Sequence, residues 1–318
     1  MLRYILKRIL QAVPLIILIS IITFGLIQLA PYDAIDAITT PDMSLEYIEV
    51  LKEVNGLNEP IYIQYFIWAK NAIRGDFGYS LVTHSNIKQA LSDRIPNSML
   101  LIVPSYIIAL IIAVILGLLA GSNRGRWIDR AVDGFCSIAI SAPSFWVGLI
   151  LIYFLSYKLN LFPSFGMYTP GSPRTTSNLL AHMVVPGLTL VIALLPQMIR
   201  YVRSSTIGQL SEDYVMVQKA FGATSHNILF RHILKNVLLP LVTLVGMSLP
   251  MLVTGAFVTE SVFSWPGVGP YFLAAIRGFD YPIIMSILAL SSSLVIIGNL
   301  LADILYNLID TRIKEMNQ

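Results

Sequence analysis

Histidine, cysteine and acidic side chains are the groups in this chain that could hold a metal or act in catalysis, and their spacing predicts neither role. His226 and His232 are six residues apart, so they would face different sides of a helix. The single cysteine, Cys136, lies in an apolar run and excludes an intramolecular disulfide. No phosphate-binding loop, His-Glu-x-x-His or Gly-x-Ser-x-Gly pattern occurs in the sequence. The chain is therefore predicted to bind no metal, to bind no ATP itself and to be no enzyme.

A polar segment at residues 200–236 separates two apolar stretches and is predicted to contain two short helices. Ser211 or Asp213 is expected to cap a first helix that runs through Ala220. Gly222 is expected to end that helix, and Ser225 to cap the next one. A connection this long and this well capped is predicted to do more than join its neighbours.

A second segment, Glu260–Gly269, combines two aromatic side chains with a proline and two glycines. By composition alone it is typical of an aromatic loop at a membrane interface, or of a re-entrant loop.

Charge is scarce in the elements that must position these segments. Of the 318 residues 12% are charged and 56% are hydrophobic, whereas soluble domains have about 25% charged residues. The net charge of +3 is too small to indicate a nucleic-acid partner. A helix needs about 20 apolar residues to cross the ~30 Å hydrocarbon core of a bilayer. Six stretches qualify: Ile9–Ala30, Ser98–Gly121, Gly134–Tyr157, Leu179–Ile199, Asn236–Thr259 and Tyr281–Ala302. They are apolar on every face, unlike barrel strands, so we expect an all-α polytopic membrane protein with six transmembrane helices in contact with lipid.

The basic residues predict the orientation of these helices. Thirteen of the 21 lysines and arginines fall on the side that receives both termini. The positive-inside rule places that side, with residues 200–236, in the cytoplasm of a cell whose inner membrane holds the chain. The predicted organisation is an N-terminus and first helix at residues 1–30, an extracellular helical insert at 31–97, a five-helix core at 98–306 and a cytoplasmic tail at 307–318.

The insert is predicted to be helical rather than disordered. Apolar residues recur at helical spacing from Leu45 to Val54, Pro60 can start a second helix, and Ser85 can cap a third that carries Ile87 and Leu91. Two compatible interpretations remain: a helical cap packed on the outer membrane surface, and a docking surface for a solute-binding protein. Prolines inside the apolar stretches favour ordinary kinks, although Pro240 and Pro250 could bend the fifth helix beside a pathway.

The two segments and several others resemble one family, the permeases of binding-protein-dependent ABC importers in their oligopeptide/dipeptide/nickel branch. The first segment carries Glu212-Asp213-Tyr214-Val215, Ala220-Phe221-Gly222, Arg231-His232-Ile233-Leu234-Lys235-Asn236 and Leu239-Pro240. Met216, Val217 and Gln218 stand where the general importer pattern has Glu-Ala-Ala. Further matches, in the family's order, are the basic N-terminus 1–8, Gly56–Pro60, Gly75–Gly78, Glu260–Gly269, Asp280–Pro282 and Asp310–Ile313.

The resemblance implies a type I ABC importer permease fold and a set of partners. These are a second homologous permease subunit, two ATP-binding subunits that use ATP and Mg, and an extracellular or periplasmic solute-binding protein. It implies alternating access, with peptides as cargo and nickel or a metal chelate also open. The residues implied to couple to the ATPase are Glu212, Asp213, Tyr214, Lys219, Ala220, Gly222, Arg231 and His232. Those implied to form an outer gate or a binding-protein contact are Glu260, Phe263, Trp265, Pro266, Gly267 and Gly269.

The main alternative from another class is a secondary transporter or channel that is not coupled to an ATPase. Such a transporter would usually carry buried charges on its spans and internal repeats, and neither is recognisable here.

Overall fold

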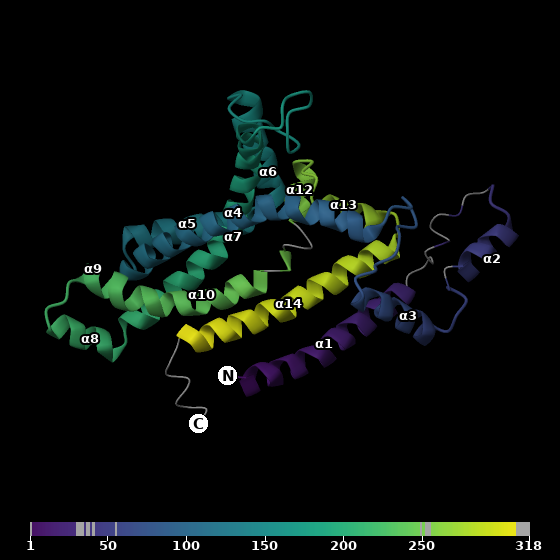
Figure 1. The fold of residues 1–318 in the computed structure, drawn as a ribbon. Coiled ribbons are helices and arrows are strands. Elements are labelled where there is room, and N and C mark those ends of the chain that lie inside the picture. The colour runs from purple at the N-terminus through teal and green to yellow at the C-terminus, as the bar shows by residue number, and fades with distance from the viewer. Residues whose placement is uncertain are drawn as a thin grey trace.

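The computed structural model of the chain describes residues 2–29, 35, 39, 42–54, 56–248, 250–251 and 256–309. Within them the secondary structure is helical, apart from one isolated β-bridge between Tyr79 and Asn86. The elements, labelled in Figure 1, are α1 (Leu2–Gln28), α2 (Leu45–Val54), α3 (Ile61–Ile73), α4 (Ile87–Ser122), α5 (Trp127–Ser141), α6 (Ser144–Leu151), the π-helix η2 (Ile152–Lys158), α7 (Thr176–Leu210), α8 (Asp213–Ala220), α9 (Ser225–Asn227), the π-helix η3 (Ile228–Ile233), α10 (Leu234–Ser248), α12 (Phe257–Val262), α13 (Val268–Arg277) and α14 (Tyr281–Ile309). The matches at residues 310–313 lie outside the described residues.

The centre of the fold is the long contact between α4 and α7. Small residues recur at every fourth position of α4, and all of them are buried: Ser105, Ala109, Ala113, Gly117 and Gly121. A Cβ added at Gly117 would lie 2.5 Å from the Cβ of Val202, and one at Gly121 would lie 2.7 Å from the Cβ of Thr206. The stripe of small residues therefore lets the two backbones approach closely, as membrane helices commonly do.

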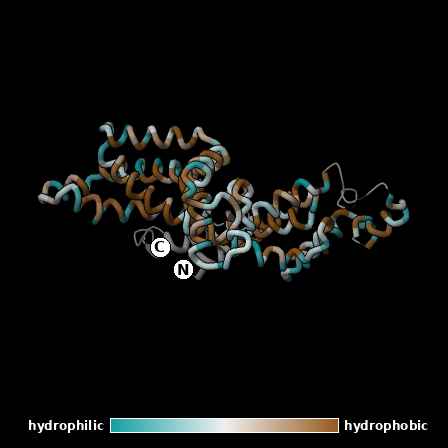
Figure 2. Tube along the Cα trace, turned by 90° about the horizontal axis from the view of Figure 1, so that it is seen from above, coloured by the Kyte–Doolittle hydropathy of each residue, from teal (hydrophilic) through white to brown (hydrophobic). Residues whose placement is uncertain are grey.

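The lengths of the helices agree with a membrane protein. Among the described residues three helices are long and apolar enough to cross a bilayer: α4, α7 and the part of α14 at Tyr281–Leu300. The Val13–Gln28 part of α1 is apolar but shorter. Hydrophobic residues run along the long helices in Figure 2, and many remain exposed on α1 and α4, such as Ile21, Ile22, Ile107 and Ile111. An apolar surface of this extent has lipid as its natural solvent, so the expected all-helical polytopic architecture is confirmed, whereas the count of six spans stays a prediction.

The third expected span is not one straight helix, which corrects the prediction for Gly134–Tyr157. The chain bends by 101° between α5 and the α6–η2 helix, so α6 runs at a steep angle to α5 in Figure 1 while still contacting α7. Ala142 has extended torsion angles, with φ −88° and ψ 122°. The ring of Pro143 disfavours the helical conformation at the preceding residue and provides no N–H for the helix ladder. The break is therefore encoded by Pro143.

Two further helices extend past their expected ends. Helix α4 begins at Ile87, capped by the side chain of Asn86, so the short helix expected after Ser85 is in fact the first part of α4. Helix α7 continues to Leu210, so the first residues of the 200–236 segment are helical. In the fifth expected span α10 ends at Ser248 and α12 begins at Phe257, and residues 249 and 252–255 lie outside the described part.

The helices of the 200–236 segment and those of the 31–97 insert lie at opposite ends of the molecule (Figure 1). Helices α8 and α9 are at one end in Figure 1, and α2 and α3 are at the other. Helix α3 packs on the adjacent end of α1, where the hydroxyls of Ser20 and Tyr65 are 2.8 Å apart and Gln28 donates to Gln64 at 3.1 Å. Helices α2 and α3 agree with the two helices expected from Leu45 and Pro60.

Candidate functional site

Helix α8 forms the outermost part of the 200–236 segment, and one buried side chain anchors it. Val215 is buried in a cluster with Leu118 of α4, Val202 of α7, and Ile228 and Ile233 of η3. This cluster joins α8 to the ends of the α4–α7 pair and to the start of the following helix. A force applied to α8 therefore acts on packed side chains rather than on a loose loop.

A polar triad supports the same helix. The Tyr214 hydroxyl donates to Gln209 Oε1 at 2.8 Å. Asn236 Nδ2 donates to the same oxygen at 2.7 Å and approaches the Tyr214 hydroxyl at 3.4 Å. Burial raises the pKa of Tyr214 above its ordinary value, and the charge of Glu212 acts in the same direction. Tyr214 thus stays protonated and donating at physiological pH, and the triad ties α7, α8 and α10 together.

The turn after α8 depends on Gly222. Its φ of +80° lies in the left-handed region, where most side chains are strained. No atom lies within 4 Å of the position that a Cβ would take there. The glycine is therefore required by backbone conformation and not by crowding.

Exposed apolar side chains protrude from α8 and its turn. Phe221 is 85% exposed and Met216 is 72% exposed, and Val217 is exposed between them. Large apolar side chains that protrude together from the polar end of a protein usually mark a protein–protein contact. Met216 and Val217 stand at two positions of the Glu-Ala-Ala pattern that this chain lacks. Both lie in α8 with exposed side chains, so both are available for contact with another protein.

The other predicted residues of this segment are distributed over its surface. Glu212, Asp213, Lys219, Ala220 and Arg231 are exposed, and His232 is half-buried in η3. The expected caps are corrected: Glu212 holds the N-cap position of α8 without a side-chain bond, and Asp213 is in the first turn. Thr224, not Ser225, caps α9 through a bond from the Asn227 N–H. Ser225 and Asp213 follow the true cap by one residue, a shift that the sequence pattern does not resolve.

The second predicted segment, Glu260–Gly269, folds around a buried carboxylate. Glu260 is fully buried. Its Oε2 accepts from the N–H of Gly269 at 2.7 Å, and its Oε1 accepts from the N–H of Ala256 at 3.3 Å. A Cβ at Gly267 or Gly269 would collide with this carboxylate. The two glycines therefore allow the chain to close around Glu260.

Helix α4 clamps this segment from the side. The indole N–H of Trp265 donates to the carbonyl of Asn97 at 2.8 Å, the Asn97 amide donates to the carbonyl of Pro266 at 3.0 Å, and the N–H of Val268 donates to Ser98 Oγ at 2.9 Å. Phe263 and Trp265 are both fully buried. The aromatic side chains thus face the protein interior, unlike those of an interfacial aromatic loop.

The predicted residues of the 200–236 segment and those of Glu260–Gly269 form two separate sites, and each site includes further residues. Asn97 and Ser98 join the Glu260 segment, and Met216, Val217 and Phe221 join α8; none of the five has a sequence pattern that marks its role. Among the described residues no three His, Cys, Asp or Glu side chains are placed to hold a metal ion. The one buried histidine, His182, bonds through its two ring nitrogens to the Thr169 hydroxyl and the Gly166 carbonyl.

Comparisons with known proteins give matches over nearly the whole chain. Residues 113–315 match the family described as binding-protein-dependent transport system inner membrane component, and residues 1–102 match the N-terminal family of the same systems. The chain is 36% identical over 312 residues to the oligopeptide transport system permease protein AppB of Bacillus subtilis, covering 98% of this chain and 99% of the relative. It is 32% identical over 314 residues to the glutathione transport system permease protein GsiC of Escherichia coli, covering 99% of both chains. The resemblance read from the sequence is thereby confirmed: the chain belongs to the family of inner-membrane components of binding-protein-dependent transport systems and is a permease subunit of an ABC importer.

Proposed function

We propose that this permease pairs with a second homologous permease and with two ATP-binding subunits to import peptides delivered by a solute-binding protein. ATP and Mg are used by the ATP-binding subunits, because the permease sequence has no phosphate-binding loop. Binding of nucleotide draws those subunits together, and the movement is passed to the permeases, which alternate between outward and inward access.

The observation that carries the proposal is the construction of α8. Val215 and Tyr214 fix its inner face, while Met216, Val217 and Phe221 protrude from its outer face. An element that transmits motion must pack rigidly against its own subunit and must also bind the partner subunit. We therefore assign the 200–236 segment as the surface that docks into an ATP-binding subunit, with Glu212, Asp213, Lys219 and Arg231 as polar contacts at its rim.

The orientation that fits this docking has six spans and both termini in the cytoplasm. The start of α1 and the end of α14 point toward the end of the molecule that holds α8 and α9 (Figure 1). Arginines gather at the same end, including Arg124, Arg126, Arg200 and Arg203, as the positive-inside rule requires. The insert at 31–97, with α2 and α3, then faces the outside.

On the outer side we assign Glu260–Gly269 as part of the gate. Its hydrogen bonds to Asn97 and Ser98 attach it to α4, one of the two central helices. Because Phe263 and Trp265 are buried, they can move with that helix but cannot contact a binding protein in this conformation. Contact with the binding protein falls instead to the insert.

Peptide cargo is supported by the relatives, whose names specify oligopeptide and glutathione transport. Nickel is the second candidate, and we expect it to travel as a chelate. The described part of the chain offers no group of ligand side chains that would hold the bare ion.

The direct test is uptake by the complex of this permease, its partner permease, the ATP-binding subunits and the binding protein, reconstituted in liposomes. A radiolabelled tripeptide library should enter only when ATP and the binding protein are both present. Uptake by the permeases alone, driven by an ion gradient, would instead establish a secondary transporter.

A further inference from the structure

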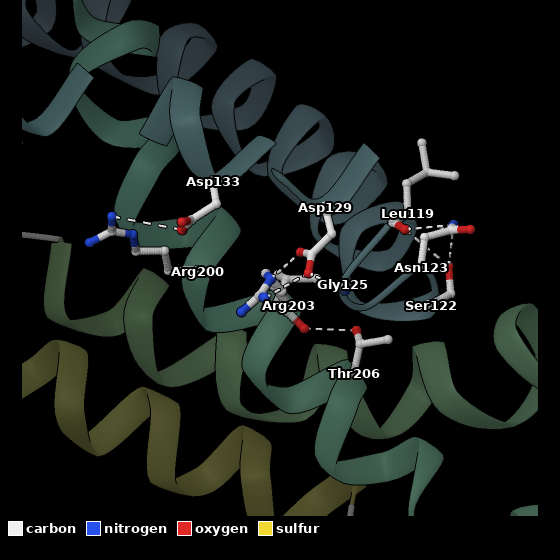
Figure 3. A network of polar contacts seen from close by, with 10 residues as sticks. Leu119, Ser122, Asn123, Gly125, Asp129, Asp133, Arg200, Arg203 and Thr206 are labelled. Atoms are coloured by element: carbon white, nitrogen blue, oxygen red, sulfur yellow. Dashed lines mark hydrogen bonds and ion pairs between the residues drawn. The ribbon is translucent and has the colours of Figure 1, made fainter. Parts of the chain in front are cut away.

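A partly buried ion pair between Asp129 and Arg203 joins α5 to α7 (Figure 3). Arg203 reaches Asp129 through two nitrogens: its Nη2 donates to Oδ2 at 2.9 Å, and its Nε donates to Oδ1. The Asp129 side chain is 5% exposed and that of Arg203 is 29% exposed. A bidentate pair with one buried partner holds both side chains in one geometry, unlike a mobile surface pair.

The pair sits where three helices meet. The N–H of Gly125, in the turn between α4 and α5, donates to Asp129 Oδ2 at 2.8 Å. The neighbours of Arg203 on α7, Val202 and Thr206, are the residues that face Gly117 and Gly121 of α4. Asp129 thus fastens α5 to the tightest part of the α4–α7 contact.

The helices that this pair connects lead to both of the segments assigned above, α8 and Glu260–Gly269. In one direction α7 runs on to α8, whose Val215 packs in the same buried cluster as Val202. In the other direction α5 leads through the bend at Pro143 to α6. There a Cβ added at Gly148 would lie 3.2 Å from the ring of Phe263, in the segment assigned to the gate.

We propose that Asp129 and Arg203 form a positioning pair that makes α4, α5 and α7 move as one body, so that displacement of α8 reaches α6 and Phe263. This inference rests on the proposed function, because it assumes that the ATP-driven movement enters at α8. The pair acts through the packing of the helices, and its effect is on the number of peptides moved for each ATP hydrolysed.

The test uses the full complex in liposomes and measures tripeptide uptake per ATP hydrolysed for Asp129→Asn, Arg203→Gln and the double variant. The double variant leaves no unpaired buried charge, so it should assemble like the wild type even where a single variant does not. All variants that assemble should keep ATP hydrolysis and lose about tenfold in uptake per ATP, in the range of ordinary coupling between distant sites. Uptake per ATP in the double variant should be no lower than in either single variant, because all three variants remove the same interaction.

Asp133→Asn is the matched control. Asp133 lies one turn further along α5 and pairs with Arg200 at 3.9 Å, but both side chains are about half exposed, at 56% and 48%. This variant should keep wild-type uptake per ATP, because exposed pairs contribute little. Wild-type uptake per ATP in the double variant would overturn the inference, as would a proportional fall of hydrolysis and uptake or the same loss in Asp133→Asn. If the wild-type complex needs no ATP for uptake, the proposed function fails instead.

Discussion

Among single residues of the 200–236 segment, Gly222 is sensitive to substitution because of its backbone conformation. Its φ of +80° strains an L side chain, a β-branched one most of all, although no other part of the fold crowds the Cβ position. Gly222→Val should therefore cost about 1–2 kcal/mol locally. The spans do not depend on this turn, so the variant should reach the membrane at near-normal level.

We expect Gly222→Val to lower transport and solute-stimulated ATP hydrolysis together. Gly222→Asn is the control, because asparagine tolerates the left-handed region, and it should retain most of both activities. The measurement is ATPase activity of the reconstituted complex with and without loaded binding protein. Equal activities of the valine variant and the wild type would mean that the turn does not set the docked geometry.

The structure also changes the expectation for Asp213. Because Asp213 follows the cap position, its carboxylate stabilises α8 through the helix dipole and not as a cap, an effect of about 0.3–1 kcal/mol. Asp213→Ala should accordingly be milder than the loss of a cap.

Residue types alone predicted that Gly222 ends α8, yet not the capping by Thr224 or the burial of Glu260. The first follows from a property that only glycine has. The other two depend on which neighbouring N–H groups the fold brings near, and on how α4 lies against residues 265–269. Local sequence carries no information about those distances.

At the scale of elements, the α4–α7 contact holds the molecule together, and its glycines allow a sharp test. Gly121→Ala places a Cβ 2.7 Å from Thr206 Cβ and 3.1 Å from the Arg203 carbonyl oxygen. The helices must then separate, at a cost of about 1–3 kcal/mol.

The matched control is Gly134→Ala in α5, where no atom lies within 4 Å of the added Cβ. Alanine should be neutral or slightly stabilising there, since it favours helix by about 0.5–1 kcal/mol over glycine. Thermal unfolding of the detergent-purified complex should show a lower midpoint for Gly121→Ala only. Equal midpoints for the two variants would argue against a close-packed seam.

The elements illustrate what hydropathy can and cannot predict. The apolar stretches located the long helices α4, α7 and α14, and the helical periodicity after Leu45 and the proline at 60 located α2 and α3. The spacing of Gly117 and Gly121 is a helix-packing signal that the sequence offers directly. The 101° bend after Ser141 is less accessible, because prolines such as Pro104 lie inside continuous helices of the same chain. Whether a proline kinks or breaks a helix depends on the neighbours that compensate for its missing hydrogen bond.

For the whole molecule, we expect the 31–97 insert and the 200–236 segment to face opposite sides of the membrane. Cysteines placed at Glu53 and at Lys219 in a Cys136→Ser background test this arrangement, because both positions are exposed and Cys136 is buried. In whole cells an impermeant thiol reagent should label position 53 and leave position 219 unlabelled until the membrane is opened. Labelling in the opposite order would reverse the topology.

We propose that ATP-driven movement enters this permease through α8, and crosslinking tests this most directly. A photoreactive benzoylphenylalanine at position 221 replaces a side chain that is 85% exposed, and its counterpart at position 53 serves as the control. After irradiation of membranes that hold the assembled importer, we expect an adduct of this chain with an ATP-binding subunit from position 221 and none from position 53. An adduct with the ATP-binding subunit from position 53, or its absence at position 221, would show that α8 does not dock into that subunit.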